Sequence, residues 1–339
     1  MITKKIKRRS AFVLSAVLAF AAMALPNVYA ALGVDTDAKC SVEINVTGVQ
    51  YKELNGTDDQ VEVLPVTVNL YKVADIDVTG TYTAVPSLET LDFSGLSSET
   101  KAAEWEALAE AAQKEVIEDQ MEATATAVTE DGVALVNELE TGLYLIDAQQ
   151  VLSANYQYEF IPYLISLPNN YFYNTDSGDD TWIYDQTGRN AIGLKPERTE
   201  RVGDLVIRKE LDVYNATIGG ATFVFQVEGS KTDIDTGETR VVYSDVLSMT
   251  FKNPGTDSLT IEDLPAGSVV TVTEIYTGAS YSVTSEESQT VMITADQVIT
   301  EFDNTYDTRL NGGNGVVNTF SYNSETKEWM HAATEDSTP

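Results

Sequence analysis

The sequence is poor in the side chains on which many hydrolytic and redox enzymes depend. Among its 339 residues there is one cysteine, Cys40, and one histidine, His331. A single cysteine excludes an intramolecular disulfide, so any covalent stiffening must use other side chains. We interpret Cys40 as a spectator rather than a nucleophile. A lone histidine close to residue 339 argues against Ser-His or Cys-His nucleophilic catalysis.

Basic residues are also scarce. The chain contains 21 Lys and Arg residues against 53 Asp and Glu residues. Five of the basic residues and none of the acidic ones lie within residues 1–30, which leaves the remainder with a formal charge of −37. Contacts to phosphate require clustered Lys and Arg, so this charge opposes binding to nucleic acid or to an anionic membrane.

The longest apolar run stands at the N-terminal end. Basic residues between Lys4 and Arg9 precede the apolar residues 11–25, and Val28-Tyr29-Ala30 offers small side chains where a signal peptidase reads them. The run is too short for a membrane span, and the residues before Cys40 do not form a lipobox. We therefore predict that residues 1–30 are a signal peptide, and that the exported mature protein contains no membrane segment.

Residues 31–198 read as a first domain made mainly of strands. Segments with alternating or continuous apolar residues are separated by turn residues such as Asn55-Gly56 and Asp131-Gly132. The one helical segment, at about residues 98–121, is rich in Ala, Glu and Lys; Ser98 is its expected N-cap, and Trp105 is expected to anchor it to the core.

Residues 204–307 read as a second β domain, with short strands at regular spacing and Gly, Pro and Asp turns between them. Residues 198–203 are expected to be a short polar linker and residues 308–339 a polar tail. The predicted fold class is all-β, with two tandem immunoglobulin-like β-sandwiches, the first carrying one inserted helix.

Three segments of the second domain each place a reactive polar side chain on a largely apolar strand face. Alternation along residues 205–211, 269–274 and 298–304 puts the polar residue in phase with bulky apolar ones. Lys and Glu are rarely buried unless paired. The three polar residues are Lys209, Glu274 and Asn304.

Two interpretations of this pattern stay open on side-chain phase alone. The first is an ordinary buried ion pair with an amide beside it. The second is covalent, because burial lowers the pKa of a lysine and raises that of a glutamate. A neutral Lys209 could then attack the side-chain carbonyl of Asn304, while protonated Glu274 hydrogen-bonds the carbonyl oxygen and relays protons as ammonia leaves.

A series of motifs across residues 204–306 adds a resemblance. In order, they are Lys209, Phe223-Val224-Phe225, Leu264-Pro265-Ala266-Gly267, Val272-Thr273-Glu274, Gly278-Ala279-Ser280-Tyr281 and Phe302-Asp303-Asn304-Thr305-Tyr306. This order resembles the collagen-adhesin B-type domain, the immunoglobulin-like module of Gram-positive pilins and adhesins. The resemblance implies an autocatalytic isopeptide bond between Lys209 and Asn304, with Glu274 as its catalyst.

The first domain resembles the N-terminal domain of fimbrial shaft pilins. The resemblance rests on residues 68–74, 142–146 and 162–168, and on Trp182-Ile183-Tyr184-Asp185 followed by Leu194-Lys195-Pro196-Glu197. It implies that Lys195 is the nucleophile through which a pilus-specific sortase joins identical subunits. The alternative is a solvated lysine near the domain boundary. No second isopeptide bond is predicted, because Lys72 has no matched Glu and late Asn.

These features predict a structural subunit of a sortase-assembled pilus in the cell wall, with no cofactor, no metal and no enzymatic activity beyond its own cross-linking. No Leu-Pro-x-Thr-Gly motif occurs before Pro339. We therefore expect either that the sequence stops short of a sorting signal or that the chain does not polymerise. The alternative function is a secreted or cell-wall adhesin that binds a host matrix protein or glycan.

Two further alternatives are weaker. A glycosidase would need paired carboxylates, but none of the acidic residues stands in a recognisable motif. A calcium module could use the acidic turns at residues 174–180 and 233–238, but neither matches the twelve-residue calcium loop. We interpret both segments as acidic turns without a metal.

Overall fold

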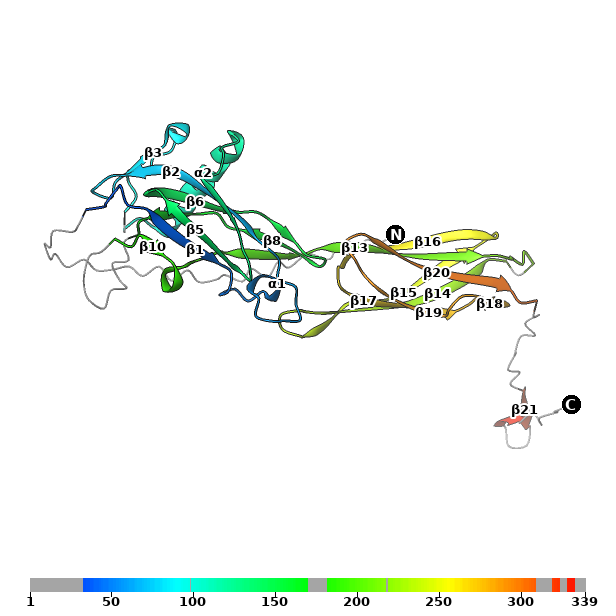
Figure 1. Ribbon diagram of the computed structural model, residues 1–339. Coiled ribbons are helices and arrows are strands. Elements are labelled where there is room, and N and C mark those ends of the chain that lie inside the picture. The colour runs from blue at the N-terminus through cyan, green and yellow to red at the C-terminus, as the bar shows by residue number, and fades with distance from the viewer. Residues whose placement is uncertain are drawn as a thin grey trace. The chain divides into compact units, whose positions relative to one another are not determined.

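The computed structural model describes residues 33–97, 99–169, 182–217 and 219–308, together with the backbone of the paired strands β21 (Thr319–Asn323) and β22 (Glu328–Ala332). The chain divides into two compact units, Met1–Thr199 and Glu200–Pro339. Strands are the commonest regular secondary structure in both units (Figure 1). The predicted signal peptide and most of the predicted tail lie outside the described residues.

Unit 1 contains three sheets, ordered β3-β2-β6-β9 with β4 beside β2, β10-β1-β11 with β5 beside β1, and β12-β8-β7. Its first strand runs parallel to β10 and β11 and antiparallel to β5. The strands are β1 (Cys40–Asn45), β2 (Thr67–Ile76), β3 (Tyr82–Ala84), β4 (Ala125–Val128), β5 (Val133–Leu139), β6 (Gly142–Ala148), β7 (Val151–Leu152), β8 (Tyr156–Phe160), β9 (Tyr163–Leu167), β10 (Asp185–Gln186), β11 (Ile192–Gly193) and β12 (Pro196–Glu200).

The inserted helix is α2 (Ala102–Glu118), which packs against β6 and β9. It buries Ala109, Ala112 and Val116, and the partly buried Trp105 packs on the same core, as expected of an anchor. The helix begins later than predicted, with Lys101 as its N-cap residue; the predicted cap, Ser98, lies outside the described residues. The four-residue helix α1 (Lys52–Asn55) was not predicted.

Unit 2 is a sandwich of two four-stranded sheets, ordered β16-β13-β20-β18 and β15-β14-β17-β19. Side chains from both sheets form one apolar core, which includes Leu205, Phe225, Val272 and Phe302. The strands are β13 (Val202–Leu211), β14 (Ala221–Thr232), β15 (Thr239–Phe251), β16 (Gly255–Pro265), β17 (Val269–Tyr276), β18 (Tyr281–Val283), β19 (Ser288–Met292) and β20 (Gln297–Tyr306).

The first and last strands of unit 2 are parallel neighbours, although they are far apart in sequence. In the register of β13 and β20, Lys209 stands opposite Phe302 and Leu211 opposite Asn304. The predicted all-β class, with tandem sandwiches and one helix inserted in the first, is confirmed. The segment expected to be a polar linker is not a loop, because strand β12 ends at Glu200 and strand β13 begins at Val202.

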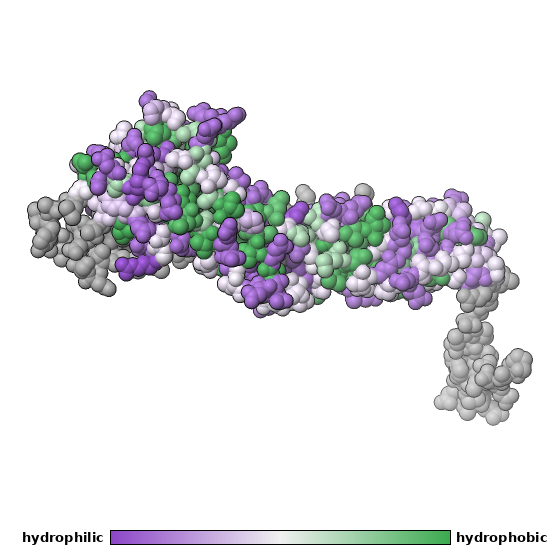
Figure 2. Space-filling model, viewed as in Figure 1, coloured by the Kyte–Doolittle hydropathy of each residue, from purple (hydrophilic) through white to green (hydrophobic). Residues whose placement is uncertain are grey.

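The surface of both units mixes hydrophilic and hydrophobic residues (Figure 2). Exposed apolar side chains include Leu135 on β5 and Val241 on β15. Single exposed apolar residues are common in soluble domains. None of the helices in the described part of the chain is both long and apolar enough to span a membrane.

Candidate cross-linking site

Three strands bring the predicted reactive residues into the interior of unit 2. Lys209 comes from β13 and Asn304 from β20, which are neighbours in one sheet, whereas Glu274 comes from β17 in the other sheet. Lys209 and Asn304 are 0% exposed and Glu274 is 4% exposed. The alternation seen in the sequence is therefore realised as three polar side chains inside one sandwich.

The Glu274 carboxyl group lies between the two nitrogen atoms. Its Oε2 is 3.4 Å from Lys209 Nζ, an ion-pair distance rather than a well-formed hydrogen bond. Its Oε1 accepts a hydrogen bond from Asn304 Nδ2 at 2.5 Å. The same amide nitrogen also donates to the Thr277 backbone carbonyl at 3.3 Å.

This arrangement differs from the sequence expectation in one respect. Glu274 was expected to face the carbonyl oxygen of Asn304, but it faces the amide nitrogen. The Thr277 carbonyl supplies the physical reason, because it can only accept and therefore favours an N–H beside it. Sequence periodicity does not indicate which end of an amide faces a neighbour.

Three buried polar atoms at this site have no hydrogen-bond partner among the described residues. They are Lys209 Nζ, Glu274 Oε2 and Asn304 Oδ1. A buried polar group without a partner costs about 1–3 kcal/mol. The three unsatisfied atoms therefore destabilise the folded state, and a role in a chemical reaction would explain why they are buried together.

One aromatic ring lies beside the amine. The Phe223 ring centroid lies 5.0 Å from Lys209 Nζ. Phe223 is itself held edge-on by Phe251 at 5.6 Å and Tyr281 at 5.7 Å. Lys209 is fully buried, and the Phe223 ring offers its amine only a weak cation–π attraction in place of water.

Burial shifts both titrating groups toward their neutral forms. Desolvation lowers the pKa of Lys209, although the charge of Glu274 opposes that shift. Desolvation also raises the pKa of Glu274, although Lys209 and the hydrogen bond from Asn304 oppose it. A neutral amine is a nucleophile and a protonated carboxyl group is an acid, so the cluster has the components for attack on an amide.

Lys195 lies in unit 1 and not with this cluster. Its side chain is exposed, between β11 and β12, and its Nζ lies 5.5 Å from the Tyr163 ring centroid. The Lys195 carbonyl accepts a hydrogen bond from Ile161 N–H at 3.1 Å. The backbone at this position is therefore held in place while the amine faces solvent.

The stretch before Lys195 is less regular than the resemblance implies. Strand β10 is only two residues long, and a 3₁₀ turn at Gly188–Asn190 separates it from β11. Lys72 does not take part in a second site of the same kind. Its amine pairs with Asp75 at 2.7 Å and with Glu140 at 3.4 Å.

A second buried lysine in unit 2, Lys231 on β14, was not predicted from the sequence. It is 3% exposed and lies 3.0 Å from Glu200, which also accepts two 2.7 Å hydrogen bonds from Arg240. The same alternation could have found it, because Lys231 is in phase with Phe225 and Val227. A lysine on an apolar strand face is therefore not sufficient evidence for a cross-link.

No group of three or more His, Cys, Asp or Glu residues in the described ranges could hold a metal ion. The acidic segment at residues 233–238 is the turn between β14 and β15. There Asp233 Oδ1 accepts the backbone N–H groups of Asp235 and Thr236. The other acidic segment, residues 174–180, lies outside the described residues.

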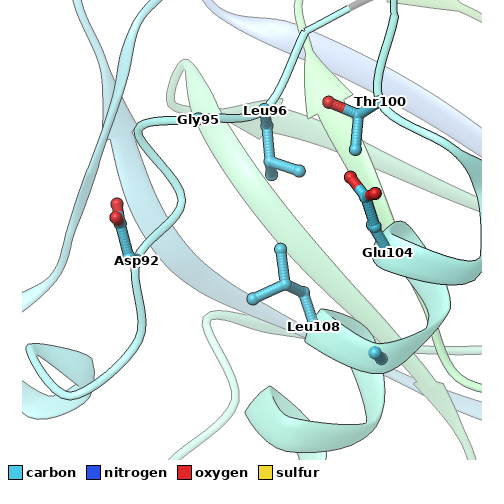
Figure 3. A pocket seen from close by; sticks show the side chains of 7 residues that line it. Asp92, Gly95, Leu96, Thr100, Glu104 and Leu108 are labelled. Atoms are coloured by element: carbon cyan, nitrogen blue, oxygen red, sulfur yellow. The ribbon is translucent and has the colours of Figure 1, made fainter.

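A hollow of about 360 Å³ lies beside α2 in unit 1 (Figure 3). Leu96 and Leu108 point into it, with Asp92 and Glu104 near its rim. Asp92 already accepts two hydrogen bonds from Ser94, at 2.9 and 2.6 Å. Nothing in this lining resembles a catalytic arrangement.

Comparison with known proteins gives a match over unit 2. A family model described as "Domain of unknown function (DUF5979)" matches residues 205–307. No curated protein matches the sequence.

Similar solved structures include several pilins. A streptococcal ancillary pilin is 12% identical over 79% of this chain and 69% of its own, with a TM-score of 0.27. The full-length major pilin SpaD from Corynebacterium diphtheriae is 13% identical over 80% and 99%, with a TM-score of 0.24. The minor pilin GBS52 from Streptococcus agalactiae is 15% identical over 81% and 99%, with a TM-score of 0.23.

These low scores and identities carry no conclusion about activity or partners. The segment matched by the family model begins at Leu205 and ends at Asp307. It therefore includes all three residues of the buried cluster, Lys209, Glu274 and Asn304.

Proposed function

We propose that the protein is a structural subunit of a sortase-assembled surface pilus, and that an isopeptide bond between Lys209 and Asn304 stiffens its second sandwich. The observation that carries the proposal is the burial of an amine, an acid and an amide in one cluster with unsatisfied polar atoms. Replacement of a buried ion pair by apolar residues is often neutral or stabilising. A purely structural role therefore does not explain why a lysine is buried at position 209. Condensation does explain it, because the amide product carries no charge.

The reaction begins with a proton transfer within the pair, which leaves Lys209 as a neutral amine and Glu274 as a protonated acid. Nζ then attacks Asn304 Cγ and forms a tetrahedral adduct. Glu274 gives the proton that it took from Lys209 to Nδ2, and the resulting carboxylate takes a second proton from Nζ. The Cγ–Nδ2 bond breaks and ammonia leaves, so that one C–N bond replaces another and no oxidant or cofactor is consumed.

The position of Glu274 suits this exchange, because each of its oxygens faces one of the two nitrogens. The nitrogen of Lys209 must lose protons and the nitrogen of Asn304 must gain one. A single carboxyl group between them can do both, as acid and as base. The protein acts on itself once, and we propose no other enzymatic activity.

The bond would join the first and last strands of the sandwich. On the loop-entropy estimate used for disulfides, closing a loop of roughly 100 residues stabilises the fold by about 5 kcal/mol. Because β13 and β20 are parallel neighbours, a force pulling on the two ends of the domain would load the covalent bond before the hydrogen bonds between strands. That property suits a subunit of a fibre under tension.

The intact mass of the secreted chain tests the cross-link. The wild type should be lighter than its sequence by one ammonia, whereas Lys209→Ala, Glu274→Ala and Asn304→Ala should each show the full mass expected from their sequences. Lys231→Met is a matched control, since it removes a buried lysine of the same sandwich and should leave the ammonia loss intact. A wild-type chain of full mass would sink the isopeptide proposal.

The polymerisation part of the proposal concerns Lys195, which would accept the C-terminal Thr of an identical subunit from a pilus-specific sortase. Its exposure in unit 1 supports this role. On the producing cell, SDS-resistant high-mass ladders should be present for the wild type and absent for Lys195→Ala. Lys114→Ala, at another exposed lysine, should keep the ladders. A cell-surface monomer that binds a host matrix protein would favour the adhesin alternative.

A further inference from the structure

The turn after β17 supplies one of the two acceptors for the Asn304 amide nitrogen. Thr277 follows the last residue of β17, Tyr276, and its backbone carbonyl accepts a hydrogen bond from Asn304 Nδ2. Glu274 accepts the second hydrogen bond from the same nitrogen. Both N–H bonds of the amide are therefore engaged, and Oδ1 has no partner among the described residues.

These two acceptors do not contribute equally to the orientation of the amide. Once Glu274 is protonated it can donate to the oxygen of Asn304 as readily as it accepts from the nitrogen. The Thr277 carbonyl can only accept, whatever the protonation state of its neighbours. A flipped amide would place Oδ1 against that carbonyl, with two acceptors in contact. Thr277 therefore decides the orientation in the protonation state that reacts.

Gly278 allows the turn to come this close. Its φ is +81°, a conformation that side-chain-bearing residues adopt only with strain. A Cβ there would lie 3.1 Å from Tyr281 Cδ2, 3.3 Å from the Thr222 carbonyl oxygen and 3.4 Å from Phe223 Cε1. The backbone oxygen can yield less than the rings can, so a methyl group would push the turn outward.

We propose that Thr277 and Gly278 form a positioning element that presents the nitrogen of Asn304, rather than its oxygen, to Glu274 as the leaving group. This inference rests on the proposed isopeptide bond and adds residues to that reaction. Neither residue exchanges protons itself. The Thr277 carbonyl fixes the amide, and the missing side chain of Gly278 lets the carbonyl reach it.

The test is the rate of ammonia loss in Gly278→Ala. The full chain is made with a photocaged lysine at position 209, folded, uncaged by light and followed by intact mass over a range of pH. Displacing a reacting group by about 1 Å costs on the order of 10²-fold in rate. The contacts of 3.1–3.4 Å at Gly278 call for a smaller shift, so we expect a loss of roughly 10-fold. The pH dependence should keep its shape, because Lys209 and Glu274 stay buried.

Gly237→Ala provides the matched control. Gly237 has a φ of +72°, close to that of Gly278, but a Cβ there would meet no atom within 4 Å. The control therefore carries a similar backbone strain without displacing the turn, and its rate should match the wild type. Equal rates in the two variants would overturn the inference. A slow Gly278→Ala variant with a shifted pH optimum would also overturn the inference, because that result would indicate that water has entered the core.

A second measurement does not depend on how well Gly278→Ala folds. In Lys209→Ala the amide of Asn304 cannot react, and its side-chain NH₂ protons can be observed by nuclear magnetic resonance. They should be protected from exchange and close in space to the backbone of residues 277–278. Rapid exchange, or protons that lie far from that turn, would refute the orientation. A wild type that never loses ammonia would refute the proposed cross-link instead.

Discussion

Lys209 and Asn304 lie on parallel, neighbouring strands, offset by two positions in the register. Lys209 stands opposite Phe302, and Asn304 stands opposite Leu211. Both side chains point into the sandwich because their positions have the same phase as these apolar partners. The long lysine side chain can span this offset, so one bond would tie the two ends of the domain directly together.

The first prediction concerns stability. Lys209→Ala should lower the free energy of unfolding of unit 2 by about 5 kcal/mol, because the unfolded chain regains the entropy of the open loop. Urea denaturation of the full chain, with protease resistance as the readout, measures the free energy of unfolding. Arg208→Ala on the same strand removes an exposed ion pair with Glu301 and should change stability by less than about 1 kcal/mol. Equal losses in the two variants would contradict the cross-link.

The second prediction separates hydrogen bonding from proton transfer at Glu274. Glu274→Gln keeps an oxygen that can accept from Asn304 Nδ2 but cannot carry a proton between the nitrogens. We expect a folded sandwich whose condensation is slower by about 10²- to 10⁴-fold, the usual contribution of general acid–base catalysis. Intact mass against time after uncaging Lys209 gives the rate. A Glu274→Gln chain that condenses at the wild-type rate would remove Glu274 from the mechanism.

The third prediction is a bell-shaped dependence of the condensation rate on pH. Burial lowers the pKa of Lys209 from its ordinary 10.5 and raises that of Glu274 from 4.5. The reaction needs neutral Lys209 and protonated Glu274. The rate therefore falls in acid as Lys209 gains a proton, and in alkali as Glu274 loses one. We expect the maximum between pH 4.5 and 10.5; a rate that still rises above pH 10.5 would show that Lys209 titrates as it does in water.

The fourth prediction concerns the ion cluster of Glu200, Lys231 and Arg240. Burial alone would raise the pKa of Glu200, but the hydrogen bonds from Arg240 and Lys231 outweigh it and hold the pKa below 4.5. A carboxyl group with a lowered pKa in the folded state stabilises the fold above 4.5, and this contribution is lost as the pH falls through the folded pKa. Glu200→Gln should therefore destabilise unit 2 at pH 7 but not in acid.

The expected loss at pH 7 is on the order of 2 kcal/mol, since the buried Lys231 ammonium would then face a neutral amide. Thermal unfolding of both proteins at pH 7 and pH 3 measures it. Arg240→Gln is the control, because Arg240 is more than half exposed and its loss leaves the Lys231–Glu200 contact in place. A destabilisation by Glu200→Gln that is the same at both pH values would show that its carboxylate charge is not the cause.

Several features of unit 1 could not be predicted from the sequence pattern. The helix could be located because Ala, Glu and Lys repeat over many turns, but its start could not, since the N-cap residue is Lys101, whose side chain makes no capping hydrogen bond. The two-residue strands β10 and β11 give too short a pattern for alternation to reveal. Their pairing with β1 depends on contacts across more than 140 residues of sequence.

The alternation of side chains by itself determined that Lys209, Glu274 and Asn304 would face an apolar interior, because a strand sends every second residue to the same side. It could not separate Lys209 from Lys231, which obeys the same rule but has the Glu200 carboxylate beside it. Only the tertiary structure placed the amine, the acid and the amide together and turned the amide nitrogen toward Glu274. That orientation depends on the carbonyl of Thr277. Every residue has this backbone group, so no pattern of side chains could have predicted the orientation.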